Sequence, residues 1–159
     1  MELKEYNSLK RSMRRLYHAS MQQFRAGHTI SVNDFEGDTA YFYRLLEDTK
    51  KLVEEELEIH RPAENVSRKK CIFFFKDPVI CQYFAQSQYP KKDIYEVAVC
   101  DVCGGFPMHI VGRLETLIKN ELDCSAQIKE YWHPSKQWNC LEYLGNSMTI
   151  IPKKYMVMR

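Results

Sequence analysis

The sequence predicts a single α+β domain, and three observations support this prediction. The chain has 159 residues, of which 45% are hydrophobic and 13% aromatic, so it carries enough apolar material for one core. Helix-type and strand-type segments alternate without a regular strand–helix–strand rhythm, which favours a mixed sheet over a parallel one. No repeat, low-complexity tract or linker divides the chain. We therefore expect residues 1–159 to form one domain, with residues 1–14 as a peripheral arm or helix.

The N-terminal part is expected to hold one strand and one long helix. Arg15–Ser20 is typical of a short strand, and residues 21–36 are expected to be irregular. Asp38 can cap a helix that runs to about Ile59, because apolar residues recur there at helical spacing. Within that helix, Glu54–Glu56 are expected on the solvent side.

The middle of the chain predicts two strands around a helix. Cys71–Phe75 is a short, fully apolar run of strand type. Asp77 followed by Pro78 is typical of a helix start, since aspartate caps the first turn and proline suits its first position. That helix is expected to reach about Gln88, and Ile94–Cys100 alternates like a strand.

The C-terminal part predicts a turn, two helices and two strands. Gly104–Gly105 is expected to turn the chain. The expected helices cover Val111–Asn120 and Ser125–Trp132, and the expected strands cover Leu141–Leu144 and Met148–Ile151.

Charge and cysteine content limit the classes of function. The formal net charge of +2 does not require a nucleic-acid partner. The charged N-terminal segment lacks the apolar region of a secretory signal, and no apolar run is long enough to span a bilayer. We therefore expect a cytoplasmic protein whose six cysteines are reduced and mostly packed like small hydrophobic residues.

Four segments, taken in order, resemble the ADP-ribosyltransferase-like superfamily. Leu16–Ser20 is similar to the family strand that ends in a His-Gly-Ser or His-Gly-Thr motif. Cys71–Ala85 is similar to the strand ending in Tyr-Phe and the helix behind it, and Asp93–Asp101 to the following strand. Leu141–Tyr143 is similar to the Glu-Tyr motif of the poly-ADP-ribose polymerases. Rifampin-modifying transferases share the first of these features, and the family has a split central sheet flanked by helices.

This resemblance implies an enzyme that transfers ADP-ribose from NAD to an unknown acceptor, which could be a protein, a nucleic acid or a small molecule. His18 would bind the ribose, and Glu142 would stabilise the positive charge that develops on the sugar. The remaining implied NAD-binding residues are Ala19, Ser20, Phe73 and Tyr83. No metal and no membrane are implied.

Three departures from the family pattern keep a catalytically degenerate nucleotide-binding or interaction module as an alternative. Ala19 replaces the glycine after the histidine, Phe73 replaces the stacking tyrosine, and Ile80 stands near the position of a carboxamide-binding serine. A shift of one residue would instead place Phe74 at the stacking position.

Two further patterns have competing interpretations. Arg68 precedes the apolar strand and could bind a pyrophosphate, but the interpretation that we prefer from the sequence is a solvated basic run, Arg68–Lys70. Cys100 and Cys103 have half of the spacing of a zinc site, which leaves a small zinc-stabilised interaction domain as a second alternative. No second matching pair of ligands follows them.

Overall fold

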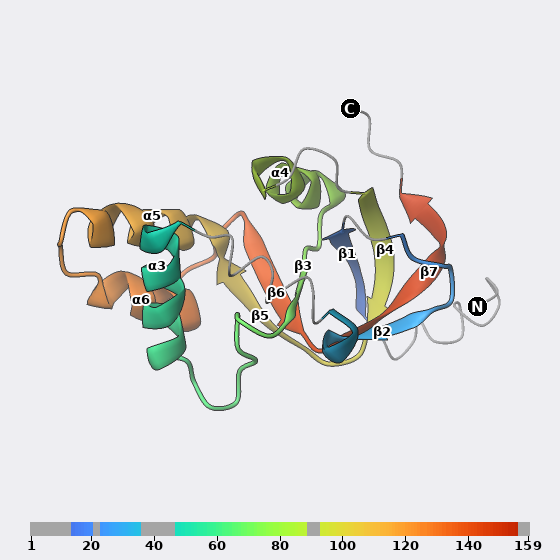
Figure 1. Cartoon of the computed structure of the whole chain (residues 1–159), viewed down its shortest axis with the longest axis horizontal. Helices are drawn as coiled ribbons and strands as arrows, with labels where there is room; N and C mark the ends of the chain where they lie inside the picture. Colours follow the sequence, from blue (N-terminus) through green and yellow to red (C-terminus); the bar gives the residue numbers. More distant parts are fainter. Residues whose placement is uncertain (1–13, 21–22, 36–46, 89–92, 156–159) are drawn as a thin grey trace. The chain divides into compact units, whose positions relative to one another are not determined.

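The α+β class is confirmed. The computed structural model describes residues 14–20, 23–35, 47–88 and 93–155, which contain four α-helices, one short 3-10 helix and seven strands (Figure 1). The chain divides into two compact units. Unit 1 comprises residues 1–32, 72–102 and 145–159, and unit 2 comprises residues 33–71 and 103–144. The expectation of one domain stays a prediction, and the arm expected at residues 1–14 lies, except for Arg14, outside the described residues.

Unit 1 is built on a four-stranded sheet with the order β1-β4-β7-β2. Its strands are β1 (Arg14–Ser20), β4 (Asp93–Val99), β7 (Ser147–Tyr155) and β2 (Thr29–Ser31). The β1–β4, β4–β7 and β2–β7 pairs are all antiparallel. Strand β4 pairs on both sides and is buried from Ile94 onward, which is why its sequence is rich in β-branched and aromatic residues.

The irregular conformation expected for residues 21–36 is only partly correct. Thr29–Ser31 form β2 opposite Ser147–Thr149, and Val32–Phe35 form a 3-10 helix. A strand of three residues has too short a pattern to be recognised locally. It exists because a partner more than a hundred residues away supplies its hydrogen bonds.

Strand β3 (Ile72–Phe74) and helix α4 (Pro78–Gln88) confirm the middle of the prediction. The Asp77 carboxylate accepts a hydrogen bond from the backbone N–H of Val79 at 2.8 Å, as expected for an N-cap. Helix α4 packs against β1 and β4 (Figure 1). Just after β3, Phe75 exchanges two backbone hydrogen bonds with Tyr17 of β1, at 2.8 and 2.9 Å.

Unit 2 contains the helices α3 (Asp48–Ile59), α5 (Met108–Lys119) and α6 (Ser125–Trp132). Helix α3 packs against α5, and α5 packs against α6. The predicted end of α3 and both bounds of α6 are confirmed. A single helix running from Asp38 is wrong, because Glu47 is extended (φ −62°, ψ 158°) and precedes the first helical residue. Asp38 itself lies outside the described residues.

Aromatic rings fill the core of unit 2. The Phe106 ring stacks on Tyr131 with centroids 5.1 Å apart, and Trp132 meets both rings edge-on. The Trp132 indole N–H donates to the carbonyl of Leu57 at 3.0 Å. Tyr131 and Leu57 are fully buried. Edge-on and offset rings contribute on the order of 1 kcal/mol per pair beyond the burial of their area.

The predicted turn at Gly104–Gly105 is wrong, because both glycines lie inside strand β5 (Val102–Pro107). Strand β5 neighbours β6 (Leu141–Gly145). A Cβ added at Gly104 would lie 2.9 Å from the carbonyl oxygen of Glu142, and the φ of Gly104 is +119°. Glycine is needed here for the close approach of two backbones and not for a reversal.

Helix α5 ends in a Schellman motif with an unusual residue. The N–H of Leu122 donates to the carbonyl of Leu117 at 2.9 Å, and the N–H of Glu121 donates to Ile118 at 3.0 Å. Glu121 has a φ of +56°, a conformation in which glycine or asparagine is normally found. A glutamate there costs roughly 1 kcal/mol relative to glycine.

Candidate functional site

His18 lies near the end of β1 and is 8% exposed. Its Nδ1 atom is 2.9 Å from the carbonyl oxygen of Phe73. A carbonyl only accepts hydrogen bonds, so Nδ1 carries the proton and donates. In the neutral ring, Nε2 is then the acceptor. The rings of Phe74 and Phe24 lie 6.0 and 6.4 Å from the imidazole, so strand β3 and its aromatic neighbours fix the position of His18.

The backbone of Ala19 points along the edge of β1 that faces away from β4. The backbone N–H and C=O of Tyr17 are directed to Phe75, on the side opposite β4. Groups two residues apart on a strand point the same way, so those of Ala19 share this direction. One N–H and one C=O side by side can bind a carboxamide, which carries one acceptor and two donors. The side chains of Ala19 and Ser20 are buried.

Of the two phenylalanines considered for the stacking position, Phe74 is the one beside His18. Phe74 is fully buried, whereas Phe73 is half-buried and its ring lies 6.2 Å from that of Phe84. Because successive side chains of a strand alternate between its faces, Phe73 and Phe74 face opposite sides of β3. Tyr83 lies on α4 and is 61% exposed, so its ring is accessible to a ligand.

Arg68, in unit 2, is buried and bonded to two carboxylates. Its Nε and Nη2 atoms donate to the two oxygens of Glu54 at 2.8 and 2.9 Å, which is the fork geometry that arginine favours. Its Nη1 atom donates to Glu142. The expectation of a solvated Arg68 is therefore wrong. So is the expectation that Glu54 lies on the solvent side of its helix, because its side chain is only 13% exposed.

Glu142 is 3% exposed and is held by two donors. In addition to the bond from Arg68, one of its oxygens accepts a hydrogen bond of 2.6 Å from the hydroxyl of Tyr131. The guanidinium of Arg68 lies 5.2 Å from the centre of the Tyr131 ring. We call Glu54, Arg68, Tyr131 and Glu142 the buried ionic cluster. It joins α3, the segment before β3, α6 and β6.

Burial and charge shift several pKa values in this region. Burial alone lowers the pKa of Arg68, but the Glu142 and Glu54 carboxylates outweigh that effect and raise it well above its usual value. Burial raises the pKa of the Tyr131 hydroxyl well above its usual value, against the opposing effect of Arg68. Burial likewise raises the pKa of the Cys71 thiol. The hydroxyl and the thiol are therefore neutral near pH 7, and the guanidinium is charged.

The predicted site residues fall into two groups. His18, Ala19, Ser20, Phe73 and Tyr83 belong to unit 1, whereas Arg68 and Glu142 belong to unit 2. Within unit 1 the structure brings the His18 ring to the Phe73 carbonyl, and within unit 2 it brings Arg68 to Glu142. A cleft shared by His18 and Glu142 stays a prediction.

Sequence reasoning missed two members of the buried ionic cluster. Glu54 lies in a run of three glutamates, and its one local signal is its position three residues before the buried Leu57. Tyr131 carried no signal beyond its place in an apolar helix. Their polar partners lie 11 to 63 residues away along the chain.

Comparison with known proteins does not assign this chain to a family. No protein-family model matches it, and no curated protein matches it significantly. Among the described residues, no helix is long and apolar enough to cross a membrane. The same part of the chain contains no group of three or more side chains of the kinds that commonly hold a metal ion.

Proposed function

We propose that this chain is a cytoplasmic, NAD-dependent mono-ADP-ribosyltransferase that acts on an unknown acceptor. The observation that carries the proposal is the end of β1, where an imidazole bonded to a backbone carbonyl precedes Ala19, whose backbone groups point to the side of β1 opposite β4. A nicotinamide carboxamide would pair with the N–H and C=O of Ala19. The ribose next to it would then lie near His18, whose Nε2 would accept from a sugar hydroxyl. The exposed Tyr83 ring would supply an aromatic surface for nicotinamide.

Release of nicotinamide from NAD tests this proposal directly. The change His18→Asn keeps a donor near the position of Nδ1, so the bond to the Phe73 carbonyl survives while the far ring nitrogen is lost. We expect the wild-type protein to release nicotinamide and His18→Asn to be slower by on the order of 100-fold. His28→Asn is the matched control, because His28 is an exposed histidine of the same unit. Absence of release with protein, nucleic-acid and small-molecule acceptors alike would contradict the proposal.

A second candidate is a catalytically degenerate module that binds a nucleotide or a partner, and the pairing of Glu142 favours it. A carboxylate bonded to Arg68 and Tyr131 must break those bonds before it can accept from a ribose hydroxyl. Calorimetry with NAD distinguishes the two functions. Heat of binding without nicotinamide release, unchanged by Glu142→Gln, is expected for the module. Loss of release in Glu142→Gln, with binding retained, is expected for the enzyme.

The zinc-stabilised interaction domain is the third candidate. It depends only on the spacing of Cys100 and Cys103, which are exposed and half-buried respectively. Metal analysis of protein purified without chelator tests it, and a stoichiometric zinc content is the result that it requires.

A further inference from the structure

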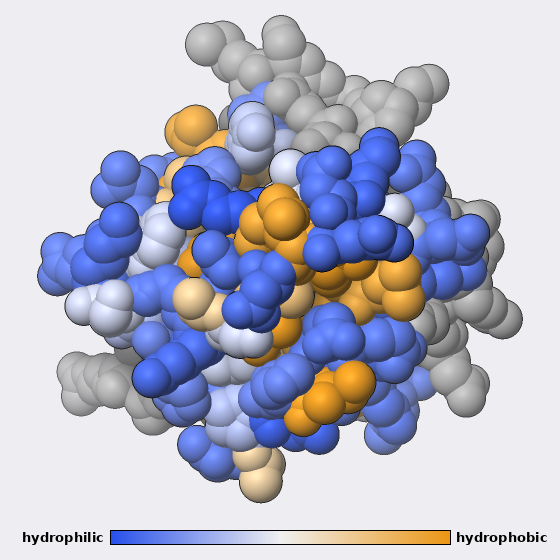
Figure 2. Space-filling view, turned by 90° about the vertical axis from the view of Figure 1, so that its left-hand side faces the viewer, coloured by the Kyte–Doolittle hydropathy of each residue, from blue (hydrophilic) through white to orange (hydrophobic). Residues whose placement is uncertain are grey.

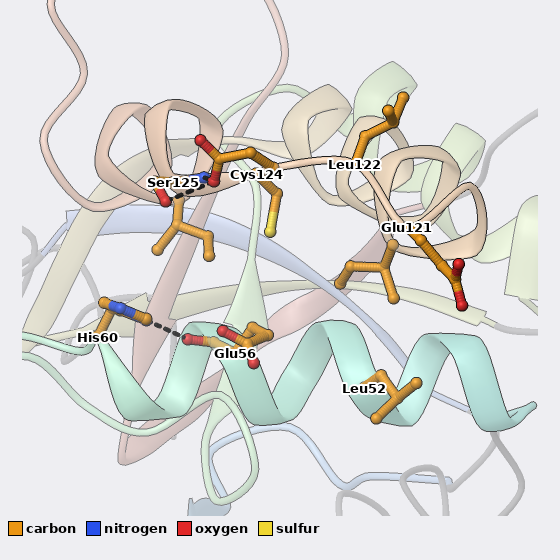
Figure 3. Close-up of a pocket in the computed structure, with 10 residues that line it drawn as sticks. Leu52, Glu56, His60, Glu121, Leu122, Cys124 and Ser125 are labelled. Atoms are coloured by element: carbon orange, nitrogen blue, oxygen red, sulfur yellow. Dashed lines mark hydrogen bonds between the residues drawn. The ribbon is translucent and has the colours of Figure 1, made fainter.

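A groove in unit 2 lies between helix α3 and the turn that joins α5 to α6. Its volume is about 350 Å³. Figure 3 shows Glu56 and Leu52 on α3, the sulfur of Cys124 directed towards that helix, and Glu121 and Leu122 at the α5–α6 turn. All of its lining residues belong to unit 2. The groove therefore shares no residue with the NAD-binding arrangement proposed at β1.

The groove has an apolar interior that is open to solvent. Among the residues that line the groove, Leu52 and Leu122 are 54% and 58% exposed, whereas Ile128 is 4% exposed. Figure 2 shows apolar side chains gathered on a face of the molecule and ringed by polar ones. Single exposed leucines are common on protein surfaces, but two that line the same groove together with a buried isoleucine give that groove an apolar lining.

The rim of this groove is acidic. Glu56, Glu121 and Asp123 contribute three carboxylates, and His60 is the one basic-type side chain among its lining residues. Hydrogen bonds from the Ser125 side chain and backbone lower the pKa of Asp123, so its carboxylate is charged at neutral pH. The rim therefore favours a partner that carries positive charge.

Glu121 contributes to this rim from an unfavourable backbone conformation. It occupies the left-handed position of the Schellman motif, with φ +56°, where glycine or asparagine would be more stable. Figure 3 shows its carboxylate directed outward at the α5–α6 turn. Positions that keep a residue at a cost in stability are often functional. The glutamate adds a negative charge to the groove that neither preferred residue would supply.

We propose that this groove binds an amphipathic α-helical segment of another protein, with apolar side chains on one face and lysine or arginine beside them. One or two leucine-sized side chains of the segment would enter the groove and contact Leu52 or Leu122, and its basic side chains would pair with the acidic rim. Binding of an amphipathic helix in an apolar groove is a common mode of peptide recognition, with anchors at i, i+3, i+4 and i+7. The charge of the rim selects against acidic segments of the same apolar pattern.

The test uses a synthetic helical peptide of about 15 residues, long enough for marginal helicity, with leucines at the anchor spacing and lysines beside them. Titration into the isotopically labelled, full-length protein is followed by NMR. We expect saturable shifts confined to the amides of the groove residues. A second peptide with glutamates in place of the lysines should bind at least about tenfold more weakly, given two or three rim pairs.

Two variants distinguish a loss of peptide binding at the groove from a loss of folding. Glu121→Gly removes one rim charge and relieves the backbone, so Tm should rise by a few degrees while peptide affinity falls about two- to fivefold. Leu122→Ser should weaken binding by a similar or larger factor without touching the backbone bond to Leu117. The controls are Glu64→Gln and Val79→Ser, which change an exposed acid and an exposed apolar residue outside the groove.

Three outcomes would overturn the proposal. They are equal binding of the lysine and glutamate peptides, affinity that is unchanged by both groove variants, and shifts that centre elsewhere on the protein. A second copy of this chain is the other possible occupant of the groove to be tested. A dimer seen by sedimentation that Leu122→Ser dissociates would assign the groove to a second copy of this chain.

Discussion

The two units of this chain fix their buried polar side chains by different means. In unit 1, a backbone carbonyl and two aromatic rings contact the imidazole of His18. In unit 2, a guanidinium is held between two carboxylates and a phenol, all of them largely out of water. In the first arrangement, a hydrogen bond to the backbone orients the imidazole ring. The second uses several charge-assisted bonds among its own members.

This difference has a consequence for function. In many sites the hydrogen bond of one ring nitrogen of histidine orients the other, and Nδ1 of His18 is bonded to a backbone carbonyl in this way. A carboxylate that serves as counter-ion for a buried arginine already has a structural role, and removal of either partner leaves an uncompensated charge. The family resemblance implies that both His18 and Glu142 act at the sugar, whereas the bonds of Glu142 to Arg68 and Tyr131 give it a structural role as well.

The largest expected effect concerns the charge balance of unit 2. Arg68→Met removes the one cation of the buried ionic cluster and leaves Glu54 and Glu142 without their counter-ion. We expect the free energy of unfolding to fall by about 3–5 kcal/mol, as for other buried ion pairs broken on one side. Urea denaturation measures it without the screening that guanidinium chloride adds.

Lys69→Met is the matched control for this change. Lys69 pairs with Glu55, and the two side chains are 29% and 47% exposed. Solvent screens such a pair, so its loss should cost less than about 1 kcal/mol. If Arg68→Met were no more costly than Lys69→Met, Glu54 and Glu142 would have to be solvated, and the contrast between the two units would disappear.

The next effect concerns backbone packing in unit 1. A Cβ at Gly145 would lie 2.8 Å from a ring carbon of Phe74 and 2.9 Å from the carbonyl oxygen of Asp101. Phe74 is fully buried and cannot move freely, so Gly145→Ala should destabilise the protein by about 1–3 kcal/mol. Because Phe74 also lies beside His18, the imidazole resonances in an NMR spectrum should shift as well.

Gly112→Ala provides the opposite case in unit 2. Gly112 lies within helix α5, and a Cβ there would meet nothing within 4 Å. Alanine is the better helix former, so this variant should be more stable by up to about 1 kcal/mol. The Tm values of Gly145→Ala and Gly112→Ala, measured by thermal denaturation, compare the two positions. Equal effects of the two substitutions would contradict the close contacts described for Gly145.

The local elements of both units could be predicted from the sequence, because their signals lie within a few residues. Asp77 and Pro78 define the start of α4, and Ser125–Trp132 was recognised with both bounds of α6. These signals act through the first turn of a helix or through one apolar face. The same local interpretation was wrong at Gly104. Glycine is required there because the backbone of a strand almost forty residues away along the chain lies too close for a side chain.

The arrangement of the polar side chains could not be predicted, because its partners are distant in the chain. Arg68 meets Glu142 across 74 residues and Tyr131 across 63. Within its own segment, Arg68 is indistinguishable from the lysines that follow it, since all three are basic residues before an apolar strand. Only the fold decides which of them is buried, and arginine is the side chain whose several fixed donors best tolerate burial between two acids.

A further expected effect is an alkaline loss of stability that belongs to unit 2. Burial raises the pKa of Tyr131 above its ordinary value of about 10, and burial also raises that of Cys71. A raised pKa in the folded state means that these groups lose their protons first in the unfolded chain. Their contribution to stability is therefore complete at neutral pH and declines as pH rises past their ordinary values towards the folded-state values.

Each group contributes a slope of up to about 1.4 kcal/mol per pH unit in that range. Urea denaturation at intervals between pH 8 and 11 measures the decline, and Tyr131→Phe isolates one contribution, because phenylalanine keeps the ring and cannot ionise. The variant will be less stable at pH 8, because Glu142 loses a hydrogen bond. Above pH 10, however, its free energy of unfolding should fall less steeply with pH, because one ionising group has been removed. Parallel curves for the two proteins would mean that the Tyr131 hydroxyl ionises as readily in the folded state as in the unfolded one, which its burial against Glu142 should prevent.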